Sequence, residues 1–154
     1  MIQRIQTLYI AGAILFSSLL LYGKIALFVG TDGSSFELRY SGLFEVTTNT
    51  ATKTEPLLAL SILLVILPII SLITLLLFKK RKLQLRFAVM SLLLLLGSVL
   101  LVGYYILYVS TKYDATVIFS IKVIFPLMAA ILMYLGFRGI LKDELLVRSY
   151  DRLR

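Results

Sequence analysis

The segment Lys79-Lys80-Arg81-Lys82-Leu83-Gln84-Leu85-Arg86 carries five positive charges and no acid in eight residues, and a long apolar run lies directly on each side of it. Basic residues beside membrane-spanning helices mark the cytoplasmic side, because carrying them across a bilayer is very costly. We therefore expect residues 79–86 to form a cytoplasmic loop that contacts lipid headgroups and fixes the orientation of two apolar hairpins.

The composition of the whole chain is that of a membrane protein. Of its 154 residues, 60% are hydrophobic, and the mean hydropathy is +0.97. Soluble domains contain about 45–50% apolar residues, so a soluble fold of this sequence would lack polar side chains to cover its surface. The net charge of +8 is compatible with nucleic-acid binding. The basic residues lie beside apolar runs, however, which favours topology and lipid contacts and predicts no nucleic-acid partner.

The chain contains no cysteine, no histidine and no tryptophan. Without cysteine there are no disulfides, no thiol redox chemistry and no thiolate metal sites. Without histidine the chain lacks the commonest metal ligand and the usual general base near neutral pH. The spacing of the Asp and Glu residues matches no acid/base or metal motif. We expect a protein that is not an enzyme, with no catalytic residue, no cofactor and no metal.

Four apolar runs predict four membrane-spanning helices, at about 8–29, 56–78, 87–109 and 117–137. Each run has more than 20 residues, enough at 1.5 Å per residue to cross a hydrocarbon core of about 30 Å. Pro56 suits the first turn of the second helix, and Pro68 predicts a kink in it. The expected fold is all-α and integral to the membrane, a four-helix transmembrane bundle.

The polar segment 30–55 predicts a small extracytoplasmic β-hairpin or meander. Residues 36–40 alternate apolar and polar side chains, which is typical of a half-buried strand. Residues 25–29 are a candidate partner strand, and residues 43–46 follow a second bend at Ser41-Gly42. Residues 47–54 are rich in threonine and are expected to form a linker.

The distribution of basic residues predicts that both termini are cytoplasmic. With this topology the inner face holds eleven Lys and Arg residues, and the outer segments and spans hold five. This asymmetry follows the positive-inside rule. The eleven basic residues of the inner face are Arg4, the five bases of the central loop (Lys79, Lys80, Arg81, Lys82 and Arg86), and the bases of the tail at 138–154.

Lys122 is the one charged residue well within a predicted span. Pro126 leaves the carbonyl of Lys122 without its helical donor, and the antiparallel third span places Tyr105 and Tyr108 at a similar depth. One interpretation is a lysine that snorkels to the interface. The alternative is a polar pocket for an anion or a lipid headgroup, which would serve a small transporter or channel.

The tail, residues 138–154, has the spacing of a helix that continues past the membrane. Glu144 and Arg148 are four residues apart, Arg148 and Asp151 three, and these spacings place them on one helical face. Leu141, Leu145 and Leu146 add a short apolar stripe.

Both ends of the chain resemble one family of small bacterial membrane proteins. The start reads Met1-Ile2-Gln3-Arg4-Ile5-Gln6-Thr7, and the end reads Lys142-Asp143-Glu144-Leu145-Leu146-Val147-Arg148-Ser149-Tyr150-Asp151-Arg152-Leu153-Arg154. This pattern is similar to the family catalogued as domain of unknown function 4293, in which a lysine usually stands where this chain has Leu145. The resemblance extends over essentially the whole chain, including Pro126. It implies four spans and a place in a Gram-negative inner membrane, with no assigned activity.

The family pattern in the tail makes it a candidate docking element. We expect an accessory or scaffold subunit of a membrane complex, whose partner is another membrane protein or a second copy of the chain, besides membrane lipids. The expected docking residues are Asp143, Glu144, Leu145, Leu146, Arg148, Asp151 and Arg152.

Overall fold

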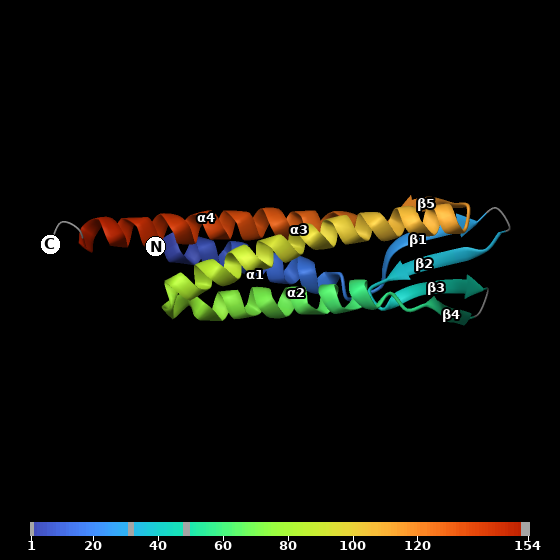
Figure 1. The fold of residues 1–154 in the computed structure, drawn as a ribbon, viewed down its shortest axis with the longest axis horizontal. Helices are drawn as coiled ribbons and strands as arrows, with labels where there is room; N and C mark the ends of the chain where they lie inside the picture. Colours follow the sequence, from blue (N-terminus) through green and yellow to red (C-terminus); the bar gives the residue numbers. More distant parts are fainter. Residues whose placement is uncertain (1, 31–32, 48–49, 152–154) are drawn as a thin grey trace.

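A five-stranded antiparallel sheet stands at one end of a set of long helices in the computed structural model (Figure 1). The structure describes residues 2–30, 33–47 and 50–151, and within these ranges the elements follow one another in the order below. They are α1 (Ile2–Leu19), β1 (Lys24–Gly30), β2 (Ser35–Arg39), β3 (Gly42–Thr47), β4 (Thr50–Glu55), α2 (Leu58–Leu76), the 3-10 turn η1 (Leu77–Lys79), α3 (Arg81–Lys112), β5 (Ala115–Phe119), the 3-10 turn η2 (Ile121–Ile124) and α4 (Phe125–Asp151).

The helices pack in the cyclic order α1, α2, α3, α4, so that each contacts two others. Small residues let α1 and α4 approach closely. A Cβ atom on Gly136 of α4 would lie 3.0 Å from Cγ1 of Ile10 in α1. Ile10 itself is fully buried, together with Leu64 of α2 and Leu95 of α3. The helices thus share one core, which continues into the sheet.

Within the described ranges, three helical segments are long and apolar enough to cross a membrane: Leu58–Lys79, Arg81–Lys112 and Ile121–Leu145. Many of their large apolar side chains point outward; Leu100 and Leu107 of α3 are about three-quarters exposed. An outer surface of this kind suits contact with lipid chains, since lipid hydrocarbon solvates leucine as well as a protein core does.

The prediction of an all-α fold with only a small hairpin is wrong. The structure contains a five-stranded sheet of order β4-β3-β2-β1-β5. The first predicted span, 8–29, is divided: α1 ends at Leu19, and residues 24–30 form β1. Gly23, with φ of +69°, makes the turn between them. A short apolar run such as Ile25 to Val29 cannot be assigned to helix or strand by periodicity alone, but its β-branched and aromatic residues favour the strand.

The fourth predicted span, 117–137, begins too early, since the corresponding apolar helical segment is Ile121–Leu145. Residues 115–119 read Ala-Thr-Val-Ile-Phe and form β5, an edge strand that pairs with β1. The helix α4 starts only at Phe125, after η2. The expected threonine-rich linker also contains a strand, β4, because threonine is β-branched and suits a pleated surface.

The pairing expected between residues 25–29 and 36–40 is confirmed. Strands β1 and β2 pair antiparallel, with Leu27 opposite Glu37 and Phe28 opposite Phe36. Strand β2 alternates as predicted, with Phe36 and Leu38 buried and its other side chains half-buried.

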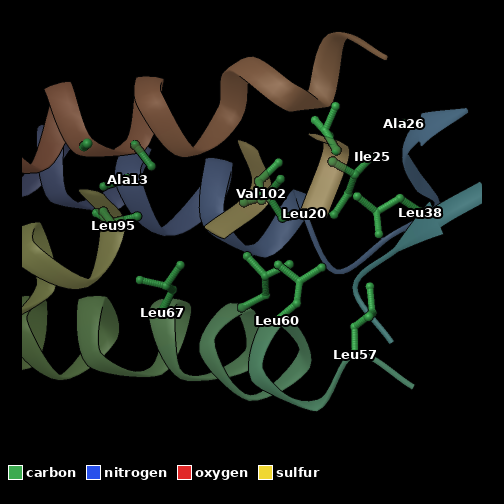
Figure 2. Packing of buried hydrophobic residues seen from close by; sticks show 14 of the residues in the cluster. Ala13, Leu20, Ile25, Ala26, Leu38, Leu57, Leu60, Leu67, Leu95 and Val102 are labelled. Atoms are coloured by element: carbon green, nitrogen blue, oxygen red, sulfur yellow. The ribbon is translucent and has the colours of Figure 1, made fainter. Parts of the chain in front are cut away.

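The buried face of the sheet joins the helix core at the ends of α1 and α2. Figure 2 shows Ile25, Ala26 and Leu38 of the sheet beside Leu20 and Leu60 of the helical part. These side chains are fully buried. The sheet is therefore supported by the helices, as a small sheet in water requires.

Candidate functional site

The two ends of the molecule differ in chemistry. We call the end that holds β1–β5 the sheet end, and the opposite end the basic end. At the basic end α1 begins, η1 joins α2 to α3, and the last turns of α4 lie (Figure 1). The basic segment 79–86, expected as a loop, is mostly helical: Lys79 ends η1, only Lys80 lies between helices, and α3 begins at Arg81.

A cavity of about 280 Å³ opens at the basic end between α1, η1, α3 and α4. Its lining combines two charged residues, three polar ones and two apolar ones. They are Arg81, Asp143, Gln6, Thr7, Gln84, Phe78 and Ile140.

Asp143 is held in place from α1. The side-chain amide of Gln6 donates a hydrogen bond of 2.8 Å from Nε2 to Oδ2 of Asp143, and Gln6 is only 8% exposed. This contact needs a glycine next to it on α4, because a Cβ atom on Gly139 would lie 2.6 Å from Cγ of Gln6.

The cavity keeps opposite charges apart. Among the described residues, the ion pairs are Lys24–Glu37, Arg39–Glu37 and Lys112–Glu55, so neither Arg81 nor Asp143 belongs to one. Gln84 is only 9% exposed, and its side chain lines the cavity. No buried side-chain nitrogen or oxygen atom among the described residues lacks a hydrogen-bond partner. The hydrogen-bonding capacity that the lining offers to a ligand therefore comes from groups that reach the cavity, above all the charged side chains of Arg81 and Asp143.

Two groups of charges at the sheet end are paired within the chain. Lys112, at the end of α3, donates to Oε1 of Glu55 and to the hydroxyl of Tyr108, and the Tyr113 hydroxyl donates to the same Glu55 oxygen at 3.2 Å. The hydrogen bond from Lys112 is the largest influence on Glu55 and holds the pKa of its carboxyl below the ordinary value. We call these four residues the junction cluster, because they tie the end of β4 to the end of α3.

A second charged cluster lies on the sheet. Glu37 accepts two hydrogen bonds from Arg39, at 2.7 and 3.1 Å, and forms an ion pair with Lys24 at 3.5 Å. Partial burial alone would raise the pKa of Glu37, but these two cations outweigh it and lower the pKa. Arg39 also lies over the ring of Phe44. The cluster is a satisfied surface network.

The side chains of Lys122, Tyr105 and Tyr108, which were proposed to form one polar pocket, each contact a different partner in the structure. Lys122 lies in η2, before α4, and its ammonium donates to the backbone carbonyl of Tyr22. Tyr108 accepts from Lys112 instead, and the ring of Tyr105 packs edge-on against Tyr104.

The proposed docking residues of the tail lie on the last turns of α4. Asp143 and Glu144 are half-buried, and Leu145 is 57% exposed. Leu146, Arg148 and Asp151 belong to α4, but their side chains lie outside the part of the chain that the structure describes, as does the whole of Arg152.

Gln6 and Gln84 were not predicted as site residues. Each is an amide within or beside an apolar helix, which is unusual enough to indicate a role, but their convergence depends on how α1, α3 and α4 pack. No group of three or more carboxylates occurs among the described residues in an arrangement that would hold a metal ion.

Comparison with known proteins gives a family for the chain. No curated protein matched the chain. The family model named Domain of unknown function (DUF4293) matches residues 2–153, nearly the full length, in agreement with the resemblance of the two ends. The chain belongs to the DUF4293 family.

Proposed function

We propose that the chain is a non-enzymatic accessory or scaffold subunit of the bacterial inner membrane, which docks a membrane-protein partner through the C-terminal end of α4. The observation that carries this proposal is the length of α4. This helix continues to Asp151 and extends beyond the other helices at the basic end (Figure 1).

The chemistry of this extension supports docking. Leu145 presents an apolar side chain that is 57% exposed beyond the start of the tail, and the following residues mix acids and bases at helical spacing. An isolated helical extension of a few turns gains little stability from such pairs, about 0.2–0.5 kcal/mol each. A partner surface that covers Leu145 would supply the missing stabilisation.

The topology that goes with this function places both termini in the cytoplasm. The eleven Lys and Arg residues assigned to the inner face lie at the basic end or in the tail, and five lie elsewhere. The sheet then lies outside the membrane on the opposite face, and the docking residues face cytoplasmic or membrane-bound partners. The ammonium of Lys122 donates to a backbone carbonyl, so among the residues that the structure describes this lysine does not favour the transporter alternative.

Site-specific photo-crosslinking in native membranes tests the proposal. A photoreactive amino acid at position 145 should give one or two discrete protein adducts, identified by mass spectrometry. The matched control carries the same amino acid at position 100, where leucine is 75% exposed on α3 and is expected to face lipid. Adducts of this chain with itself would identify the partner as a second copy. Absence of a discrete adduct at 145, or the same adducts from both positions, would contradict the proposal.

A further inference from the structure

The cavity at the basic end has features of a site for a ligand of mixed charge. It holds one cation, Arg81, and one anion, Asp143, which do not form an ion pair with each other. The side chain of Gln84, which carries an amide, lines it as well. We propose that this cavity binds a phosphoethanolamine group, a phosphate ester that carries a primary ammonium.

The phosphate half of the ligand fits Arg81 and Gln84. A guanidinium offers two parallel N–H donors in the geometry of two phosphate oxygens, and it stays charged at any physiological pH. The NH₂ group of Gln84, one turn further along α3, adds a neutral donor. Arg81 is also the first residue of α3, where the helix dipole favours an anion.

The ammonium half fits Asp143. Oδ2 of Asp143 already accepts a hydrogen bond from Gln6, and this contact orients the carboxylate while leaving Oδ1 for a ligand. A primary ammonium donates three hydrogen bonds and can bind a carboxylate directly. A trimethylated ammonium has no N–H group to donate, so a choline headgroup would leave the carboxylate unpaired.

The size and place of the cavity suit a headgroup without its acyl chains. A volume of about 280 Å³ holds a small polar group, and Phe78 and Ile140 give it one apolar wall. Phe78 is 60% exposed, and it ends the apolar segment Leu58–Lys79, which is long enough to cross a membrane. The same chemistry can come from phosphatidylethanolamine in the bilayer or from a soluble phosphoethanolamine diester.

This inference is independent of the docking proposal. It uses the side of α4 that faces α1 and α3, where Asp143 is engaged by Gln6. Docking uses Leu145 and the residues that follow. Crosslinking at position 145 and ligand binding in the cavity can therefore succeed or fail separately.

Lipid binding to the purified, delipidated full-length protein tests the inference. Native mass spectrometry would measure the affinity of phosphatidylethanolamine, phosphatidylcholine and phosphatidylglycerol with identical chains. We expect phosphatidylethanolamine to bind at least tenfold more tightly than the other two. Arg81→Gln should weaken it at least tenfold, and Asp143→Asn should reduce its affinity to that of phosphatidylglycerol. Lys82→Gln removes a neighbouring exposed charge that does not line the cavity, and it should change the affinity less than twofold.

The soluble arm uses glycerophosphoethanolamine as a competitor. Displacement of the lipid at a similar concentration would assign the site to a soluble ligand, and failure to displace it would assign the site to the bilayer lipid. Each variant is first checked for unchanged thermal unfolding without lipid, and Arg81→Lys replaces Arg81→Gln if the latter unfolds. Equal affinity for all three lipids and no displacement by glycerophosphoethanolamine would overturn the inference. Equal losses from Arg81→Gln and Lys82→Gln would overturn it too.

Discussion

The sheet end and the basic end of this molecule handle polar groups in opposite ways. At the sheet end, Glu37 and Glu55 are each satisfied by basic partners within the chain. At the basic end, Arg81 and Asp143 line the same cavity without forming an ion pair, and Gln84 lines it beside them. Internal pairing is what a structural region requires, and unused hydrogen-bonding capacity is what a binding region requires. We therefore propose a structural role for the sheet end and a recognition role for the basic end.

The largest effect is expected from Gly42→Ala at the sheet end. A Cβ atom there would lie 2.5 Å from the backbone oxygen of Glu55, and φ of +143° is strained for any side chain. The clash is with backbone and cannot be relieved by rotating a side chain. We expect a loss of about 3 kcal/mol of unfolding free energy, measured by denaturant unfolding in detergent.

Gly33→Ala is the matched control for this strain. Gly33 also has a positive φ, +78°, but a Cβ atom there would meet nothing within 4 Å. The expected cost is that of the backbone conformation alone, about 1 kcal/mol. Equal costs at positions 42 and 33 would show that the contact with Glu55 adds nothing.

Gly139→Ala is expected to act at the basic end and to change binding more than folding. The new methyl group would displace the side chain of Gln6, which is flexible, and break its hydrogen bond to Asp143. The expected loss of stability is about 1 kcal/mol, typical of one hydrogen bond. Binding of phosphatidylethanolamine should fall as well, in the same mass spectrometry measurement. Gly97→Ala, where a Cβ atom meets nothing within 4 Å, should leave binding unchanged and should not lower stability, because alanine favours a helix over glycine.

The smallest effect is expected from Glu55→Gln in the junction cluster, and it should depend on pH. Because the folded protein lowers the pKa of Glu55, the ionised carboxylate adds stability above the ordinary carboxyl pKa, and this stability is lost as the pH falls through the lowered value. The variant should unfold about 1–2 °C below the wild type at pH 7, and the gap should close in acid. Glu45→Gln makes the same charge change away from this cluster, and we expect it to unfold at the same temperature as the wild type at pH 7. A gap for Glu55→Gln that does not change with pH would contradict the role of the ion pair.

Much of the helical part was predictable because long apolar runs with clear basic flanks have few alternatives. Residues 56–78 and 87–109 correspond to α2 and the central part of α3. The division of residues 8–29 was not predictable from hydropathy, since Ile25 to Val29 are as apolar in a strand as in a helix. What decides their state is pairing with β2, whose residues lie 6 to 12 positions away (Val29–Ser35 to Ala26–Leu38), and with β5, whose residues lie 87 to 93 positions away (Val29–Thr116 to Ala26–Phe119).

The cavity was less accessible to sequence reasoning than the fold. Arg81 was predicted as a topology residue and Asp143 as a docking residue, and nothing in their spacing of 62 positions connects them. Gln6 joins them to one site only because Gly139 lets α1 approach α4. The alternation of residues 36–40, by contrast, is a local property, and it predicted β2 and its partner strand correctly.

The contrast between the two ends rests on their lying on opposite sides of a membrane, and cysteine labelling tests this most directly. The chain has no cysteine, so Ser41→Cys, between β2 and β3, and Lys82→Cys, at the start of α3, each introduce a single reporter thiol. In spheroplasts treated with a membrane-impermeant maleimide, we expect Ser41→Cys to be labelled at once and Lys82→Cys only after the membrane is permeabilised. Labelling of Lys82→Cys in intact spheroplasts, or equal labelling of both variants, would contradict the account.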